Sequence, residues 1–361
     1  MRPFLRFLTW LLRIVFLRRL SLGMAKRGSS GLSRIIGIDK PVGMSSHDVV
    51  NVVRKTYSER RVGHTGTLDP LASGVLTVCI GPATRLNQFL VDHDKTYRMA
   101  VELGSATTTD DSEGQIIATG QIKDEFFEPV FARTKIASLV GSHNQIPPAY
   151  SAIKVHGQKA YEAARSGKVI NLEPRPIEIY RASLLSIEET VNEQGMKIPV
   201  WNVEMHVSKG TYLRSIARDL GNSLGSFAHV KSLRRLTVGS LTLRQCCTLE
   251  QLQSDPNSAC IDPLQLLKIR YAFISNDSAL DNGRSFDKEE VSLNEPIEGD
   301  IFGSECCTTS VYPSTRAPYN DELVAFVSHN KVKGLYRFDE SAQKYKPSCI
   351  FSLGVERGSG L

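Results

Sequence analysis

The order of predicted strands and helices constrains the fold of this chain more than any other feature of its sequence. Apolar runs of strand length alternate with helical patterns through the first 245 residues, without forming regular strand-helix-strand repeats. Predicted strands lie at 34–39, 75–80, 97–103, 176–189 and 199–207, and predicted helices at 46–57, 125–140, 158–166 and 212–224. This order predicts an α+β fold in which helices flank a central mixed or antiparallel sheet.

Charge divides the chain into three parts. Residues 1–38 hold eight Lys or Arg and no Asp or Glu, and we expect residues 1–33 to form an N-terminal extension. Residues 34–245 are expected to form the main domain, and residues 246–361, with 11 basic and 17 acidic side chains, a smaller C-terminal domain of uncertain fold. The middle of the chain, 39–245, carries a net charge of +4, which suits nucleic-acid binding but is also common in other proteins.

The extension allows two interpretations. Residues 2–20 are apolar and interrupted by arginines, which disfavours a membrane span, and they lack a small-residue cleavage site. An Arg-rich amphipathic start is typical of a mitochondrial or plastid transit peptide. We favour the alternative that Met24 is the true start, because the first 20 residues are poor in Ser, and we then expect a cytoplasmic protein. Either way, residues 1–23 are expected to be dispensable for activity.

The seven cysteines show no metal-binding or disulfide pattern. None are spaced C-x-x-C, so a zinc site is disfavoured. The odd number in a chain of this length favours a reducing compartment.

A loop rich in Gly and Pro is the most informative motif. Residues 63–74, GHTGTLDPLASG, separate two predicted elements. Asp69 precedes Pro70, which favours an extended backbone at the aspartate. Glycines allow another molecule to approach the backbone closely. The loop is therefore predicted to present one carboxylate at a surface.

The rest of the chain gives this aspartate its context. Five segments, at 37–50, 61–76, 147–165, 208–221 and 229–236, resemble the TruB family of tRNA pseudouridine synthases, bacterial type, in the family's order. The resemblance covers roughly residues 34–245. It implies the pseudouridine-synthase fold and an isomerase that converts uridine-55 in the T-loop of tRNA to pseudouridine. It further implies that tRNA, through its T-arm, is the partner, with no guide RNA, no membrane, no cofactor and a monomeric enzyme.

The resemblance also assigns roles to individual residues. Asp69 matches the catalytic nucleophile, and Arg214 matches a residue that lines the base pocket, which we expect to be catalytic as well. The remaining matched residues are expected to bind the substrate, and they are His64, Tyr97, Tyr212 and Leu233. No metal ligand is implied.

These roles agree with the chemistry of the reaction. Pseudouridine forms when a C–N glycosidic bond breaks and a C–C bond forms at C5 of the base. A carboxylate can hold either the sugar C1′ or the base C6 covalently during this exchange, and the resemblance does not say which. A guanidinium beside the carboxylate favours its ionised form and orients it. The target base must leave its stack to react, and an aromatic ring then gives it a stacking surface.

Each residue also has an ordinary structural explanation. Asp69 fits a solvated turn, because Asp-Pro is common in turns. His64 can bond within its own loop, Tyr97 can pack in a sheet, and Tyr212 and Leu233 can belong to the core.

Two further expectations concern basic residues. Arg214 lies at a predicted helix start, where a cation is unfavourable, so it needs an anionic partner such as Asp69. The basic residues Lys231, Arg234 and Arg235 fit phosphate contacts and a solvated face equally well.

Two other functions remain open at this stage. The chain could be an RNA chaperone without catalysis, although Asp69, Tyr97 and Arg214 are intact. It could also be the catalytic subunit of a guide-RNA particle, as in the dyskerin branch, but it lacks long Lys-rich tails. Residues 246–361 show no match to an RNA-binding module of the PUA type.

Overall fold

A computed structural model describes most of the chain beyond its N-terminus. The described residues are 30–151, 153–155, 158–159, 172–192, 194–257, 259–297 and 313–358, without the side chains of 154–155 and 158–159. Most of the expected extension and residues 160–166 of one predicted helix lie outside these ranges. Within them, no helix is long and apolar enough to cross a membrane.

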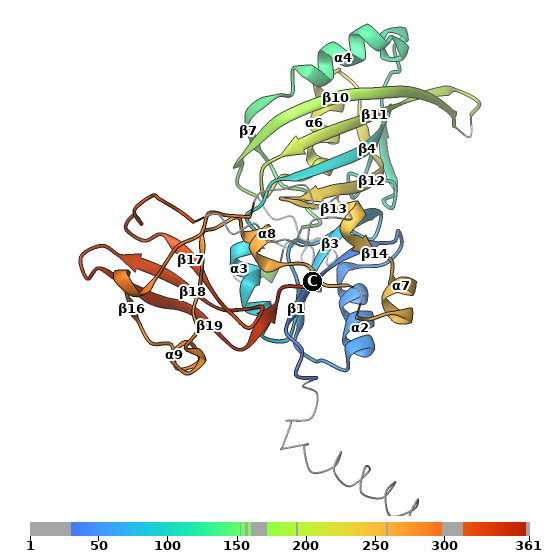
Figure 1. Ribbon diagram of the computed structural model, residues 1–361. Helices are drawn as coiled ribbons and strands as arrows, with labels where there is room; N and C mark the ends of the chain where they lie inside the picture. Colours follow the sequence, from blue (N-terminus) through green and yellow to red (C-terminus); the bar gives the residue numbers. More distant parts are fainter. Residues whose placement is uncertain are drawn as a thin grey trace, which may run out of the picture.

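A ten-stranded mixed sheet forms the larger part of the molecule (Figure 1). Its path runs β14-β1-β3-β12-β4-β11-β10-β7, with β13 paired to β12 and β2 to β3. In chain order the strands are β1 (Arg34–Lys40), β2 (Val62–His64), β3 (Ala72–Ile80), β4 (Lys95–Leu103), β7 (Gly141–Gln145), β10 (Arg175–Val191), β11 (Lys197–Val207), β12 (Ala228–Val238), β13 (Leu241–Thr242) and β14 (Cys246–Cys247). The predicted α+β class with a mixed sheet is confirmed.

Strand β12 joins the two halves of this sheet. It runs parallel to β3, so that Leu233 pairs with Ala72, and antiparallel to β4, so that Arg235 pairs with Tyr97. Residues near the end of β12 therefore lie between β3, which follows the Asp69 loop, and β4, which carries Tyr97.

Helices pack against the two halves of the sheet separately. Helix α2 (Ser46–Tyr57) buries its valines against β1 and β3, and α7 (Leu249–Ser254) joins the same cluster. Helices α4 (Pro129–Ala137) and α6 (Leu213–Ser223) pack on the other half. Ser45 caps α2, with its side chain accepting from the Asp48 amide, while Asp48 accepts from the Ser45 amide.

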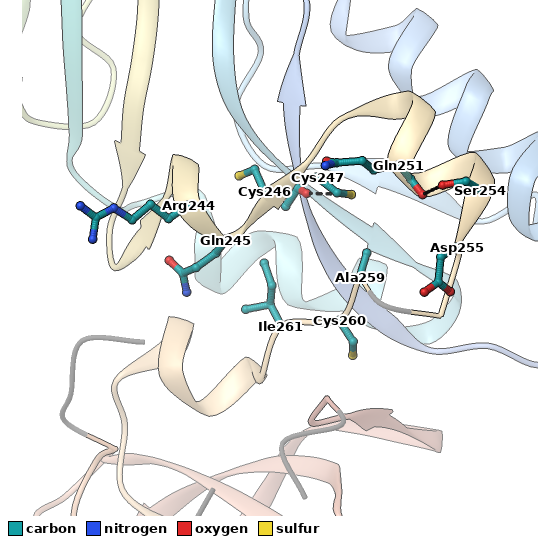
Figure 2. A pocket seen from close by; sticks show the side chains of 11 residues that line it. Arg244, Gln245, Cys246, Cys247, Gln251, Ser254, Asp255, Ala259, Cys260 and Ile261 are labelled. Carbon is teal, nitrogen blue, oxygen red and sulfur yellow. Dashed lines mark hydrogen bonds between the residues drawn. The ribbon is translucent and has the colours of Figure 1, made fainter. Parts of the chain in front are cut away.

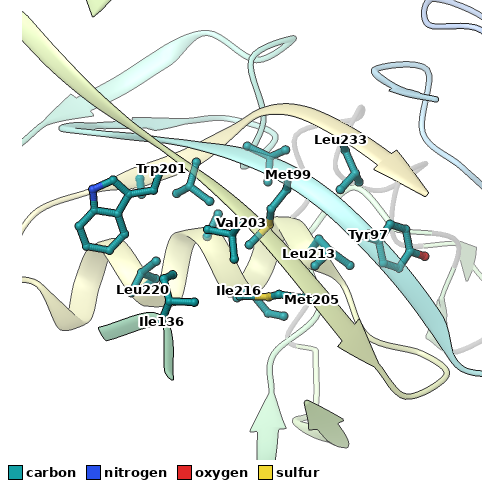
Figure 3. Close-up of a cluster of buried hydrophobic side chains, with 14 of the residues drawn as sticks. Tyr97, Met99, Ile136, Trp201, Val203, Met205, Leu213, Ile216, Leu220 and Leu233 are labelled. Carbon is teal, nitrogen blue, oxygen red and sulfur yellow. The ribbon is translucent and has the colours of Figure 1, made fainter. Parts of the chain in front are cut away.

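The core of the second half extends to the end of the sheet that faces the Asp69 loop. Trp201 lies at one end of this hydrophobic cluster, and Tyr97 and Leu233 lie at the other (Figure 3). Tyr97 and Leu233 are both buried, with 7% and 8% of their surface exposed.

A second sheet of five strands follows, in the order β15-β17-β18-β19-β16. Its strands are β15 (Tyr271–Phe273), β16 (Phe286–Asp287), β17 (Leu323–Ser328), β18 (Lys331–Asp339) and β19 (Lys344–Glu356). One hydrophobic cluster contains Ile35 and Val75 of the first sheet together with Val327 and Phe351 of the second. The two sheets therefore share a core.

Short elements complete the described chain. The helices are α3 (Asn87–Leu90), α8 (Pro263–Leu267) and α9 (Asp277–Asp281), with 3-10 turns η1 (Gly81–Leu86), η2 (Asp124–Phe127), η3 (Leu243–Gln245) and η4 (Lys288–Glu290). Two ribbons form separate two-stranded sheets, β5 (Ser105–Thr107) with β6 (Ile116–Thr119) and β8 (Lys154–Val155) with β9 (Gln158–Lys159).

The structure corrects three element predictions. The expected loop 63–74 begins inside β2 and ends inside β3, because both ends pair with neighbouring strands. The expected helix 125–140 is divided into η2 and α4, with Pro129 at the start of α4. Gln158 and Lys159, expected at a helix start, form β9.

Candidate active site

The loop between β2 and β3 carries Asp69 at the surface of the larger sheet. Gly74, near the start of β3, has a φ of +105°, and a Cβ there would lie 2.1 Å from the Arg235 carbonyl oxygen. Only glycine allows the two strands to approach so closely at this point. The loop therefore lies directly beside β12.

Asp69 is paired with the arginine that the sequence assigned to it. Arg214 Nε lies 2.9 Å from Asp69 Oδ2 and 3.6 Å from Oδ2 of a second carboxylate, Asp111. Its Nη1 donates to the Thr109 carbonyl at 2.8 Å and its Nη2 to the Tyr150 carbonyl at 2.8 Å. The arginine side chain is 5% exposed and that of Asp69 is 38% exposed. Asp69 is thus held on one side and open to a ligand on the other.

A cavity of about 630 Å³ opens over this ion pair. Five of the six predicted residues line it, namely Asp69, Tyr97, Tyr212, Arg214 and Leu233. Its volume is within the usual range for small-molecule sites, and its walls combine apolar and aromatic groups with a few charges. The cavity could hold one extruded nucleobase.

The start of α6 fixes both Tyr212 and Arg214. Tyr212 is the residue before the helix and provides no side-chain cap. Instead, the buried Gln145 amide donates to the Tyr212 carbonyl at 3.0 Å and accepts from the Tyr212 amide at 2.9 Å. Burial raises the pKa of the Tyr212 phenol. Gln145 thereby acts as a cap supplied by β7, and sequence reasoning missed it because the partners are distant in the chain.

His64 is the one predicted residue that does not line this cavity. It lies in β2, and its Nδ1 is buried without a hydrogen-bond partner among the described residues. Burial lowers the pKa of His64, and the positive charges of Arg235 and His47 lower it further. The structure therefore places His64 in β2, at the start of the loop, rather than with the other five residues.

The three basic residues of β12 lie in different environments, because the side chains of Lys231 and Arg234 are 39% and 42% exposed whereas Arg235 is buried. Lys231 pairs with Glu102, and Arg234 with Asp39 at 2.7 Å. Arg235 is 1% exposed. Its guanidinium donates to backbone carbonyls of β3 and of the Asp69 loop, namely Val75 at 2.7 Å, Gly66 at 3.1 Å and Thr67 at 3.4 Å. It therefore holds the loop, and a solvated face is wrong for this residue.

Two lysines near the cavity were also missed. Lys40 is fully buried and donates to the carbonyls of Met44 and Pro41, and burial lowers its pKa to about 8. Lys95 lines the cavity, and burial followed by the nearby Arg235 charge lowers its pKa to about 8. The sequence signals that could have pointed to them are the position of Lys40 directly before Pro41 and that of Lys95 two residues before Tyr97.

A second hollow of about 400 Å³ lies beside β14 and contains none of the predicted residues (Figure 2). It is lined by Cys246, Cys247 and Cys260, and burial raises the pKa of each thiol, to about 12 for Cys246 and about 11 for Cys260. Protonated thiols are poor nucleophiles and metal ligands. Throughout the described residues, no group of three or more His, Cys, Asp or Glu side chains is arranged to hold a metal ion.

Comparisons with known proteins identify the family of this chain. Residues 54–213 match the family described as "TruB family pseudouridylate synthase (N terminal domain)", and residues 214–265 match "tRNA pseudouridylate synthase B C-terminal domain". The "tRNA pseudouridine synthase B" of Salmonella typhimurium is 43% identical over 229 residues, covering 63% of this chain and 69% of that protein. The protein of the same name from Burkholderia mallei is 38% identical over 260 residues, covering 71% and 81%.

Solved structures show the same fold at lower identity. The "Crystal Structure of a Cbf5-Nop10-Gar1 Complex" matches with a TM-score of 0.58 and 21% identity, covering 91% of this chain and 87% of that one. The "Structure of H/ACA RNP bound to a substrate RNA containing 2'-deoxyuridine" matches with a TM-score of 0.58 and 19% identity, covering 92% and 88%. These likenesses concern the fold alone.

The family matches and the relatives define a pseudouridine synthase, and such enzymes are isomerases. Within that class, the chain belongs to the TruB family.

Proposed function

We propose that this enzyme converts uridine-55 in the T-loop of tRNA to pseudouridine, with Asp69 as the nucleophile. The observation that carries the proposal is the half-exposed Asp69 carboxylate, ion-paired to the buried Arg214 at the edge of a cavity sized for a base. The names of the relatives from Salmonella and Burkholderia support tRNA as the substrate.

The proposed reaction moves one bond within the nucleotide. The C1′–N1 bond breaks, the base turns while bound, and a C1′–C5 bond forms. The proton on C5 is released and N1 gains one, so no redox partner or group donor is needed. The Asp69 carboxylate holds C1′ or C6 covalently in between. An intermediate bound to the protein keeps the base from diffusing away while it turns.

The other residues of the cavity bind the extruded base. Tyr97 offers a ring on which it can stack, and Leu233 provides an apolar contact on the neighbouring strand. Tyr212 closes the cavity at the start of α6. Arg214 keeps the Asp69 carboxylate oriented toward the space that the base would occupy. His64 remains a proposed RNA contact outside the cavity.

We further propose that the enzyme acts alone, as a monomer, without a guide RNA. The alternative of a guide-RNA particle draws on fold likeness at 19–21% identity, whereas the TruB relatives match at 38–43%. An RNA chaperone without catalysis would not need a carboxylate such as Asp69 that is oriented by a buried arginine. The cellular compartment stays a prediction, since residues 1–29 lie outside the described ranges.

One assay separates these possibilities. Purified protein is mixed with an unmodified tRNA transcript carrying tritium at C5 of its uridines, with no other RNA. Release of one tritium equivalent, lost when position 55 is changed to cytidine, supports the proposal. Release only after a guide RNA is added would favour the particle, and tRNA binding without release would favour the chaperone.

A further inference from the structure

The residue before Asp69 is held by a side chain from another element. Ser46, in the first turn of α2, is 2% exposed. Its hydroxyl donates to the Leu68 carbonyl at 3.0 Å and accepts from the Leu68 amide at 2.8 Å. One hydroxyl therefore satisfies both backbone groups of Leu68, which is itself 3% exposed.

The preceding residue, Ser45, has a different structural role. Ser45 caps α2 and exchanges hydrogen bonds with Asp48 within the same turn. The hydrogen bonds of its side chain stay within the start of α2. The two serines are thus neighbours in the chain, but one stabilises the helix and the other joins the helix to the Asp69 loop.

Other contacts hold the loop on both sides of Leu68 and Asp69. Before them, Arg235 donates to the carbonyls of Gly66 and Thr67. After them, the Gly43 amide donates to the Pro70 carbonyl at 2.8 Å. Ser46 holds the backbone between these two anchors, at the position that sets the direction in which the Asp69 side chain leaves the loop.

We propose that Ser46 is a positioning residue for Asp69, which it orients through the Leu68 backbone. The inference rests on the proposed role of Asp69 as nucleophile. The bond to the Leu68 carbonyl restrains the peptide that joins Leu68 to Asp69, and the bond to the Leu68 amide restrains the peptide before it, so the backbone of Leu68 is fixed on both sides and the carboxylate meets the sugar or base from a fixed direction. A displacement of about 1 Å at a reacting group can lower a rate by about 100-fold. Arg214 restrains the carboxylate at its tip, and Ser46 adds a restraint on the backbone from which the side chain leaves.

The test compares two serine-to-alanine variants of the full chain. Ser46→Ala and Ser45→Ala each remove one hydroxyl from the same turn. For each, we would measure the single-turnover rate at saturating tRNA transcript, the Kd for that transcript and the thermal midpoint. We expect Ser46→Ala to lower the rate by about tenfold or more while Kd stays within about twofold. Ser45→Ala is expected to lower the midpoint and leave the rate within about twofold, because helix caps act on stability.

Two outcomes would overturn the inference. The first is a Ser46→Ala rate within about threefold of wild type, and the second is an equal loss of rate in both variants, which would indicate a shared effect on stability. If Ser46→Ala does not fold, Ser46→Cys takes its place, because a thiol of similar size bonds more weakly. A Ser46→Cys rate equal to wild type would then contradict the inference, and a loss of rate at unchanged Kd would support it.

Asp69→Asn is measured in the same assays, and it distinguishes a failure of the positioning role of Ser46 from a failure of the proposed function of Asp69. If Asp69→Asn is inactive and Ser46→Ala is normal, only the positioning role fails. If Asp69→Asn remains active, the proposed function of Asp69 itself fails.

Discussion

Arg214 approaches the Asp69 carboxylate most closely through Nε, which lies 2.9 Å from Oδ2. Its two terminal nitrogens donate instead to the carbonyls of Thr109 and Tyr150. The guanidinium therefore does not grip the aspartate with a two-nitrogen fork, although that is the geometry most often expected of such pairs. The guanidinium links the loop of Asp69 to the segments that contain Thr109 and Tyr150, and the hydrogen bonds to those carbonyls fix its orientation.

The first prediction follows from this geometry. Arg214→Lys keeps one positive charge, but a lysine cannot reach Asp69 and both carbonyls together. We expect the single-turnover rate to fall by at least about tenfold, and the free energy of unfolding to fall by about 1–3 kcal/mol because buried carbonyls lose a charged donor. Quench-flow and urea unfolding measure the two quantities. A variant with normal turnover would show that Arg214 does not orient Asp69.

The second prediction concerns the neighbouring arginines of β12. Arg235→Met leaves carbonyls of Val75, Gly66 and Thr67 without their buried donor, so we expect a loss of at least about 2 kcal/mol in unfolding free energy. Arg234→Met is the matched control, because Arg234 is 42% exposed and pairs with Asp39 near the surface, where such pairs contribute up to about 1 kcal/mol. Equal losses in urea unfolding would contradict the assigned role of Arg235.

The third prediction is a pH dependence at His64. Burial lowers the pKa of this imidazole in the folded protein, whereas in the unfolded chain it titrates near its ordinary value of about 6.5. As the pH falls below about 6.5, the unfolded state takes up a proton before the folded state does, so stability decreases. His64→Gln removes this contribution. We expect the loss of unfolding free energy between pH 7.5 and 5.5 to be smaller in the variant than in the wild type. His93, whose pKa is also lowered, is present in both proteins, so its contribution to this loss is the same in each. The same loss in both proteins would mean that His64 titrates normally.

Local signals in the sequence predicted much of the fold. The valines of α2 and the apolar run of β3 mark their elements because burial follows helical or strand periodicity. The ends of β2 and β3 were missed because they depend on pairing with distant strands. The hydrogen bond from Ser46 to Leu68, 22 residues away, was also missed because no local pattern reveals it.

The sequence predicted which residues belong to the site better than it predicted how they are arranged in space. Asp69, Tyr97 and Arg214 came from motifs and lie together at one cavity. Asp111 and Gln145 join them only through the ribbon of β5 and β6 and through the pairing of β7 with β10, which no local pattern reveals. Arg235 looked like a surface cation because its burial results from the parallel pairing of β12 with β3.

The most direct test of the account replaces Asp69 by Asn, which is nearly isosteric and should leave the loop intact. An amide is a poor nucleophile, so no covalent intermediate can form. RNA binding should change little, because phosphate contacts and base stacking supply most of it. The measurement is tritium release from C5-labelled uridine in tRNA, beside a filter-binding assay. We predict no release above background and a Kd within about tenfold of wild type, a difference of about 1.4 kcal/mol. Clear residual turnover, in protein free of other pseudouridine synthases, would contradict the assignment of Asp69 as the nucleophile.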